Sequence, residues 1–173
     1  MDLSEVYSEH YRSLVRFLYR RTGDQGLAED FAQEAFVRAI EHQPEQPKAW
    51  LFQVAANLAR DDHRRRAVRY RHLALVGSEA GSLTAGSLGG ARPDVALERN
   101  ESTARVRAAL AELAPNDRDG LLLKEEGLSY DEIAEVLGLS RASVGTTLSR
   151  ARNRLAVAYE RLETEGSQTD AAS

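Results

Sequence analysis

An all-α fold in two small helical lobes is predicted by three features of the sequence. Apolar residues recur at the spacing of amphipathic helices along most of the chain. No stretch alternates apolar and polar residues in the way that a half-buried strand does. A segment rich in glycine, serine and alanine separates the helical patterns into two groups. The expected organisation is a lobe at 1–76, a flexible linker at 77–93, a second lobe at 94–163 and a disordered tail at 164–173.

Three helices are expected in the first lobe. The first ends near Gly23, and Asp24 begins a second helix that carries apolar residues as far as Ile40. A polar loop with two prolines, residues 42–47, precedes a third helix that begins near Lys48 and runs into a cluster of arginines. The inward-facing residues of this third helix are expected to be Trp50, Leu51, Val54, Ala55 and Leu58.

The second lobe opens with a helix over residues 95–113 and a short helix after Pro115, and then shows two helices joined by a tight turn. Ser129 stands three residues before Glu132, which is the spacing of a capping box. Gly138 suits the left-handed conformation that ends a helix. A single apolar stripe then marks the last helix at Val144, Leu148, Ala151 and Leu155. Two helices joined by a three-residue glycine turn predict a helix-turn-helix.

The outer face of this last helix suggests DNA binding. No acidic residue occurs from Arg141 to Arg154. Small polar residues near the start of the helix can approach base edges, and arginines can hold phosphates or reach guanine. The simpler alternative is an ordinary helical hairpin with a solvated basic face. The agreement of turn spacing, caps and missing acids favours the DNA-binding interpretation.

The charge of the chain is unevenly distributed. Its net charge is −4. The second helical stretch contains six acidic residues and a single arginine, Arg38, whereas six arginines follow between Arg60 and Arg71. The acidic residues are Asp24, Glu29, Asp30, Glu34, Glu41 and Glu45. An acidic segment beside basic ones suggests two partners, a basic protein surface and a nucleic acid.

Several classes of function are disfavoured. The chain contains no cysteine, so it has neither disulfides nor thiolate metal sites. Its four histidines lack metal-ligand spacing, and no glycine-rich phosphate loop or activated serine is found. No apolar run approaches the length of a membrane span, and the N-terminal residues do not resemble a signal peptide. We therefore expect a cytoplasmic protein that is not an enzyme, inserts in no membrane and needs no metal or cofactor.

Both lobes contain stretches that resemble a known family. AEDFAQEAFVRAI (residues 28–40) and AWLFQVAANLARDDHRRR (49–66) resemble region 2 of bacterial sigma-70-family factors. LAELAPNDRDGLLLKEEGLSYDEIAEVLGLSRASVGTTLSRARNRL (110–155) resembles their region 4. Two lobes and a short linker are similar to the extracytoplasmic-function (ECF, group IV) sigma factors. The resemblance implies a dissociable subunit that directs RNA polymerase to promoters and helps to melt the −10 region.

The resemblance also implies a role for the second helix. In the family, this helix binds a coiled coil on the largest catalytic subunits of core RNA polymerase. The matching residues here are Asp30, Gln33, Glu34 and Phe36. Carboxylates can pair with a basic coiled coil, while Phe36 would add an apolar anchor. Alternatively, Phe31 and Phe36 are core residues and the carboxylates are merely solvated. We expect this for Phe31, and expect docking for the three polar residues.

Two DNA-binding sets follow from the same resemblance. The single-stranded −10 element would be held by the loop at 42–48 and by Lys48, Gln53, Asn57, Arg60, Arg64 and Arg65. The −35 duplex would be read by Arg141, Ser143, Gly145, Thr146, Thr147, Ser149, Arg150 and Arg152. The sequence departs from the family at Gly145 and Thr147, where many members carry basic residues, and its −10 loop is short. Trp50 is expected to be a core residue and not a base-stacking platform.

Three hypotheses are compatible with the residues. The first is an ECF sigma factor that binds core RNA polymerase and promoter DNA, and that is held inactive by an anti-sigma factor between its lobes. The second is a freestanding regulator that uses only its helix-turn-helix. The third is an interaction protein whose lobes mainly bind a protein regulator. An acidic docking helix followed by a DNA-reading lobe favours the first hypothesis.

Overall fold

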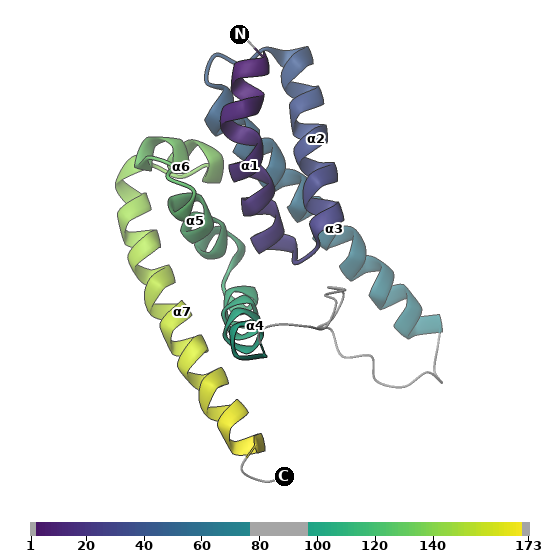
Figure 1. Ribbon diagram of the computed structural model, residues 1–173, viewed down its shortest axis with the longest axis vertical. Helices are drawn as coiled ribbons and strands as arrows, with labels where there is room; N and C mark the ends of the chain where they lie inside the picture. Colours follow the sequence, from purple (N-terminus) through teal and green to yellow (C-terminus); the bar gives the residue numbers. More distant parts are fainter. Residues whose placement is uncertain (1–2, 77–96, 171–173) are drawn as a thin grey trace. The chain divides into compact units, whose positions relative to one another are not determined.

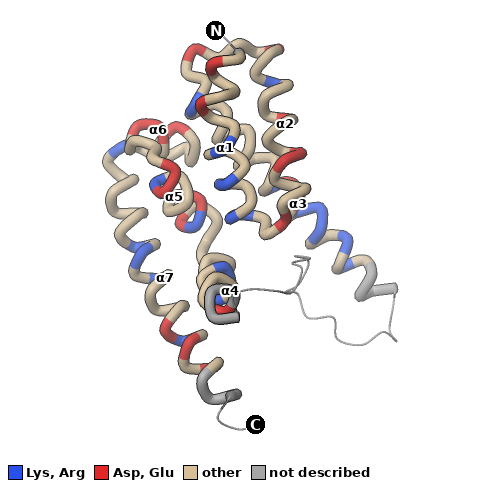
Figure 2. Tube along the Cα trace, viewed as in Figure 1, with Lys and Arg blue, Asp and Glu red and all other residues tan. Residues whose placement is uncertain are grey.

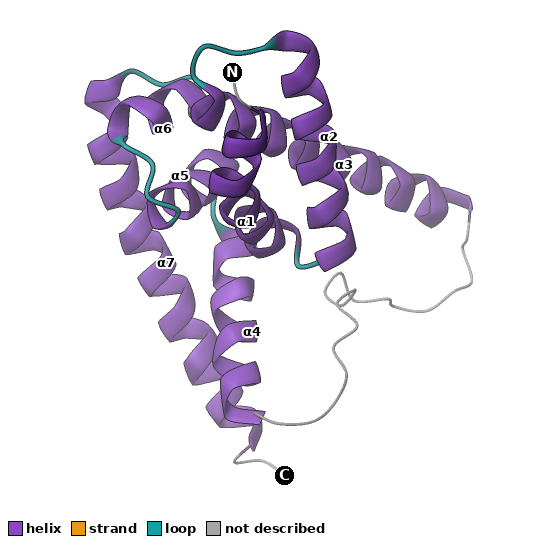
Figure 3. Cartoon of the chain, turned by 45° about the horizontal axis from the view of Figure 1, so that its top comes forward, coloured by secondary structure: helices purple, strands orange, loops and turns teal. Residues whose placement is uncertain are grey.

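The protein forms two compact helical units, one on each side of the predicted linker. The computed structural model describes residues 3–76 and 97–170, with side chains over 4–72 and 101–166 (Figure 1). All regular elements in these two ranges are α-helices, which confirms the all-α prediction (Figure 3). The linker expected at 77–93 lies outside the described residues. None of the described helices combines the length and the apolar composition that crossing a membrane requires.

The first unit contains three helices, α1 (Leu3–Thr22), α2 (Gln25–His42) and α3 (Pro47–Val76). The Asp24 side chain accepts a hydrogen bond from the Leu27 amide at 2.9 Å and so caps the start of α2, where the sequence predicts it. One face of α2 is a fully buried alanine stripe, which lets α1 and α3 approach its backbone closely. The stripe consists of Ala28, Ala32, Ala35 and Ala39.

The core of the first unit lies between α1 and the first half of α3. Phe17 and Phe52 meet edge to face with ring centroids 5.4 Å apart. Buried beside them are Leu14, Leu18, Leu51, Ala55, Ala56 and Ala59. From residue 61 to residue 72, by contrast, every side chain of α3 is exposed or half-buried. This second half of α3 therefore extends away from the bundle, and it carries the arginine cluster (Figure 2).

The second unit contains α4 (Leu97–Glu112), α5 (Pro115–Glu125), α6 (Tyr130–Leu137) and α7 (Arg141–Asp170). The predicted capping box starts α6: the Ser129 hydroxyl accepts from the Glu132 amide at 3.2 Å, and the Ser129 amide donates to the Glu132 carboxylate at 2.7 Å. Gly138 ends α6 in the left-handed conformation, with φ of 65°. The stripe Val144, Leu148 and Ala151 of α7 is fully buried.

The structure differs from the sequence prediction at the end of the chain. Helix α7 extends to Asp170, whereas a disordered tail was expected from residue 164. Ion pairs join α7 to α4 just before this point, where Arg161 pairs with Glu112 and Arg105 pairs with Glu163. A helix that is already formed also propagates at low cost through a polar segment. Residues 171–173 lie outside the described residues.

Candidate nucleic-acid interface

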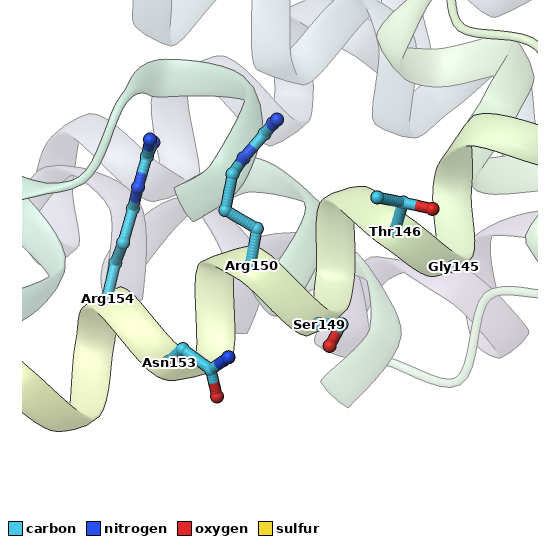
Figure 4. A pocket seen from close by; sticks show the side chains of 6 residues that line it. All are labelled: Gly145, Thr146, Ser149, Arg150, Asn153 and Arg154. Atoms are coloured by element: carbon cyan, nitrogen blue, oxygen red, sulfur yellow. The ribbon is translucent and has the colours of Figure 1, made fainter.

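The outer face of α7 carries an open groove that joins four of the eight residues predicted to read duplex DNA. The groove is lined by Gly145, Thr146, Ser149, Arg150, Asn153 and Arg154 (Figure 4). Asn153 and Arg154 extend the predicted set toward the middle of α7. We call these six residues the α7 groove. Small polar side chains beside arginines offer donors and acceptors to base edges and cations to phosphates.

The residues predicted outside the groove divide into two groups. Arg141, Ser143 and Arg152 are exposed on α7. Thr147, which was expected near phosphates, is only 7% exposed. It precedes Leu148 on the inner side of the helix and contributes to the packing of the second unit. The prediction of a phosphate contact by Thr147 is therefore corrected.

A buried carboxylate on α5 orders the two arginines of the α7 groove. Asp117 is 1% exposed, and its Oδ1 accepts from Arg150 Nη2 at 2.8 Å while its Oδ2 accepts from Arg154 Nη1 at 2.8 Å. Hydrogen bonding from Arg150 lowers the pKa of the Asp117 carboxyl, despite the opposing effect of desolvation. This contact has no local signal in the sequence, since the partners of Asp117 are 33 and 37 residues away.

The predicted −10 residues lie along α3. Gln53, Asn57, Arg60 and Arg64 recur at three- and four-residue spacing, so they share one face of the helix. Arg60 Nη1 donates to Asn57 Oδ1 at 3.0 Å, and Arg64 lies 3.9 Å from Asp61. Arg65 is exposed beside this face, and Lys48 is half-buried near the start of the helix. The face combines amides and cations, which suits a single-stranded polynucleotide.

Trp50 is half-buried, and the prediction that it belongs to the core is wrong in this respect. Its ring centroid lies 5.6 Å from that of His42, across the loop between α2 and α3. Trp50 stands in the first turn of α3, next to the loop. An aromatic surface therefore remains accessible beside the α3 face, where an unpaired base can stack.

The acidic helix α2 presents a mixed polar and apolar stripe. Asp30 and Gln33 are exposed, and they are followed at helical spacing by Val37 and Ile40, which are 50% and 51% exposed. We call these four residues the α2 stripe. Glu34, on its flank, accepts from Arg38 Nε at 2.8 Å. A stripe that combines polar side chains with exposed apolar ones is typical of a protein-docking surface.

Phe36 does not belong to this stripe. It is buried against Tyr7 and Tyr11, with ring centroids 5.0 and 6.1 Å away. The expectation that Phe36 anchors a partner is therefore corrected, because the ring is already used within the unit. Phe31, expected in the core, is half-buried instead. Val37 and Ile40 are the apolar docking candidates that sequence reasoning missed.

Comparison with known proteins gives matches across both units. A family model for sigma-70 region 2 matches residues 6–69, and a model for sigma-70 region 4 matches residues 103–155. RNA polymerase sigma factor YlaC of Bacillus subtilis (strain 168) is 31% identical over 160 residues, which are 89% of this chain and 90% of that protein. ECF RNA polymerase sigma factor SigM of the same strain is 32% identical, over 93% of this chain and 97% of SigM.

A solved structure matches the fold. It is the sigma factor RpoE of Bartonella quintana, in a co-crystal structure with the anti-sigma factor NepR. The TM-score is 0.66 at 24% identity, and the match covers 92% of this chain and 97% of RpoE.

Proposed function

The chain belongs to the extracytoplasmic-function sigma factors of the sigma-70 family. We propose that its two units divide polymerase binding and promoter recognition among three surfaces: the α2 stripe, the face of α3 that carries Gln53, Asn57, Arg60 and Arg64, and the α7 groove. A sigma factor of this class binds RNA polymerase and promoter DNA for transcription initiation and is not itself an enzyme. The polymerase performs the synthesis. The observation that carries the proposal is the uneven distribution of charge along the chain: acidic residues predominate on α2, whereas arginines predominate on the second half of α3 and on the first half of α7 (Figure 2).

The α2 stripe is the proposed docking surface for core RNA polymerase. Asp30 and Gln33 offer a carboxylate and an amide to a basic coiled coil, and Val37 and Ile40 supply apolar area that is exposed in the free protein. Charge complementarity accelerates association, whereas burial of Val37 and Ile40 would supply affinity. Glu34 can also bind the basic coiled coil when its exposed ion pair with Arg38 breaks, since such surface pairs are weak.

The α3 face and the loop before it are the proposed site for the unpaired −10 strand. Bases outside the stack are held by aromatic faces and amides, and their phosphates by cations. Trp50 and His42 offer the aromatic surface, while Gln53 and Asn57 offer the amides. The arginines of the second half of α3 would then follow the phosphate backbone.

The α7 groove is the proposed reader of the −35 duplex. Thr146, Ser149 and Asn153 stand where an α-helix in the major groove meets base edges. Arg141 forms an exposed ion pair with Asp131 at 2.6 Å, which a phosphate can replace at little cost. Arg152 is also exposed and would lie near the backbone.

Regulation by an anti-sigma factor in the cytoplasm is part of the proposal. The similar protein RpoE is known in complex with the anti-sigma factor NepR. An inhibitor of this kind would cover the docking and DNA-facing surfaces of both units at once. Release of the inhibitor would then make all three surfaces available to polymerase and promoter.

In vitro transcription tests the proposal. Core RNA polymerase free of other sigma factors, given the full chain and a genomic promoter library, should yield defined starts that share −35 and −10 motifs. The Asp30→Arg/Glu34→Arg variant should lose both core binding and transcripts while keeping its helical content. A control with the same charge change, Glu160→Arg/Glu165→Arg on α7, should retain both. Duplex DNA binding without any initiation would instead support a freestanding regulator.

A further inference from the structure

The contact between Asp117 and two arginines connects the interior of the second unit to the α7 groove. The carboxylate is 1% exposed, whereas the Arg150 and Arg154 side chains are 50% and 56% exposed. The arginines therefore do not need Asp117 for solvation. Asp117, in contrast, needs their charge, because an isolated carboxylate at this depth would be strongly disfavoured. The pair of bonds fixes flexible surface side chains to a rigid point in the fold.

The geometry leaves both guanidinium groups available to a second partner. Each uses one terminal nitrogen for one carboxylate oxygen, and an arginine carries five N–H donors in a planar fork. In Figure 4 both side chains extend to the same side of α7 and run nearly parallel. Ser149 and Asn153 point to another side of the helix. The α7 groove thus holds its cations in a defined place relative to its small polar side chains.

Asp117 also changes the charge that the groove presents. Two arginines and one aspartate sum to a single positive charge, so the acid weakens non-specific attraction to phosphates. In exchange, it restricts two long side chains before DNA arrives, which removes part of the entropy cost from the binding step. Hydrogen-bond donors that are held in fixed positions bind one arrangement of bases and phosphates more tightly than others.

We propose that Asp117 is a positioning residue for duplex recognition, which fixes the positions of Arg150 and Arg154 in the α7 groove and increases sequence discrimination at the expense of non-specific DNA affinity. The inference rests on the proposed reading of the −35 duplex by this groove. Asp117 lies on α5 and is not among the residues that line the groove. The α5 helix supports the arrangement locally, since Asp117 lies in its first turn, where the helix dipole favours negative charge.

The test compares Asp117→Asn with the control Glu112→Gln. Glu112 pairs with Arg161 between α4 and α7, so both variants remove one carboxylate of an ion pair in the same unit. Full-length protein bound to core RNA polymerase is titrated against a promoter fragment and against the same fragment with a scrambled −35 element, at several salt concentrations. Asp117→Asn should lower the ratio of the two affinities by about fivefold or more. Its salt dependence should steepen by about one unit of slope on the scrambled fragment.

Asp117→Glu separates position from charge. The longer side chain keeps the negative charge but displaces the carboxylate, so it should reduce discrimination while the salt dependence stays close to that of the wild type. Unchanged discrimination in both Asp117 variants, or an equal loss in Glu112→Gln, would overturn the inference. If the wild type itself does not distinguish the scrambled −35 element, the proposed function of the α7 groove fails, and the role of Asp117 fails with it.

Discussion

At the scale of single residues, Asp117 illustrates how a buried charge is tolerated. Its carboxyl group is removed from water, yet each oxygen accepts a charge-assisted hydrogen bond. Hydrogen bonding from Arg150 is the largest contribution that lowers its pKa. A group whose pKa is lower in the folded state than in the unfolded chain stabilises the fold above the unfolded value. This stabilisation is lost as the pH falls toward the folded pKa.

We predict that Asp117→Asn changes the acid sensitivity of the second unit. Near neutral pH the variant should melt below the wild type, because it lacks the charge that both arginines bind. The difference should shrink as the pH falls below the unfolded pKa of about 3.9. Far-UV circular dichroism melts of both proteins between pH 7 and pH 3 provide the measurement. A difference that grows toward low pH would contradict the assignment.

Gly145 provides a second prediction at this scale. A β-carbon built at Gly145 would lie 3.7 Å from Tyr130 Cε2, an ordinary van der Waals contact, so the interior of the unit leaves room for alanine. Glycine inside a helix costs up to about 1 kcal/mol relative to alanine. Gly145→Ala should therefore stabilise the second unit by roughly that amount. If DNA approaches the backbone at this point, the same variant should weaken binding to a −35 element.

The two effects can be measured separately. Trp50 is the only tryptophan of the chain and lies in the first unit, so its fluorescence follows that unit alone. Circular dichroism follows both units. Gly145→Ala should raise the midpoint seen by circular dichroism and leave the tryptophan midpoint unchanged. A variant that is stabilised and also binds the −35 element as tightly as the wild type would show that Gly145 serves no close approach to DNA.

The single residues also show where sequence reasoning succeeds and where it fails. Ser129 and Gly138 were predicted correctly, because caps depend on neighbours three or four residues away. The roles of Phe31 and Phe36 were not, since both rings lie on one apolar helix and only the position of α1 decides which is enclosed. Asp117 carried no signal at all, because its partners come from a distant helix.

At the scale of elements, the two helix starts of the helix-turn-helix differ in strength. Helix α6 has a complete capping box. At the start of α7, the Ser140 and Ser143 hydroxyls lie 2.6 Å apart and bond to each other. Because the two hydroxyls bond to each other, they contribute less to the unpaired backbone amides at the start of the helix. The sequence is consistent with this difference, because Ser140 precedes α7 as Ser129 precedes α6, but the residue three positions later is Ser143 and not a glutamate.

Substitution of each serine by alanine should reproduce the difference. Ser129→Ala removes a cap and should destabilise the second unit by about 1 kcal/mol. Ser140→Ala should cost clearly less than Ser129→Ala. Both midpoints are measured by circular dichroism, with the tryptophan fluorescence of the first unit as the internal reference. Equal losses would mean that Ser140 caps α7 as effectively as Ser129 caps α6.

Helix boundaries and helix faces differ in how well the sequence predicts them. The starts of α2 and α6 follow from caps, and the buried stripe of α7 follows from its period. Helix α7 extends past the predicted boundary at residue 163, since a helix that packing has already formed propagates at low cost through a polar segment. The residues proposed for the −35 and −10 elements lie largely on one face of α7 and on one face of α3, as their spacing indicates. The burial of Thr147 and Trp50 was predicted wrongly, because both residues lie at the border between the exposed and the buried face of their helix.

At the scale of the whole molecule, each unit has its own core and its own outward surface. The first unit carries the α2 stripe and the α3 face, and the second carries the α7 groove. A defect confined to one surface should therefore leave the functions of the other unit intact. This independence makes the proposed division of labour testable with two variants of the same chain.

We predict that the two variants behave oppositely in competition with the wild type. Thr146→Glu/Ser149→Glu places acidic side chains in the α7 groove, so it should repel DNA but still occupy core polymerase. With limiting core, an equimolar mixture with the wild type should lower transcription to roughly half by mass action. Asp30→Arg/Glu34→Arg cannot hold the polymerase and should leave transcription by the wild type unchanged. If both variants compete equally, docking does not depend on the α2 stripe; if neither competes, the α7 groove is itself required for polymerase binding.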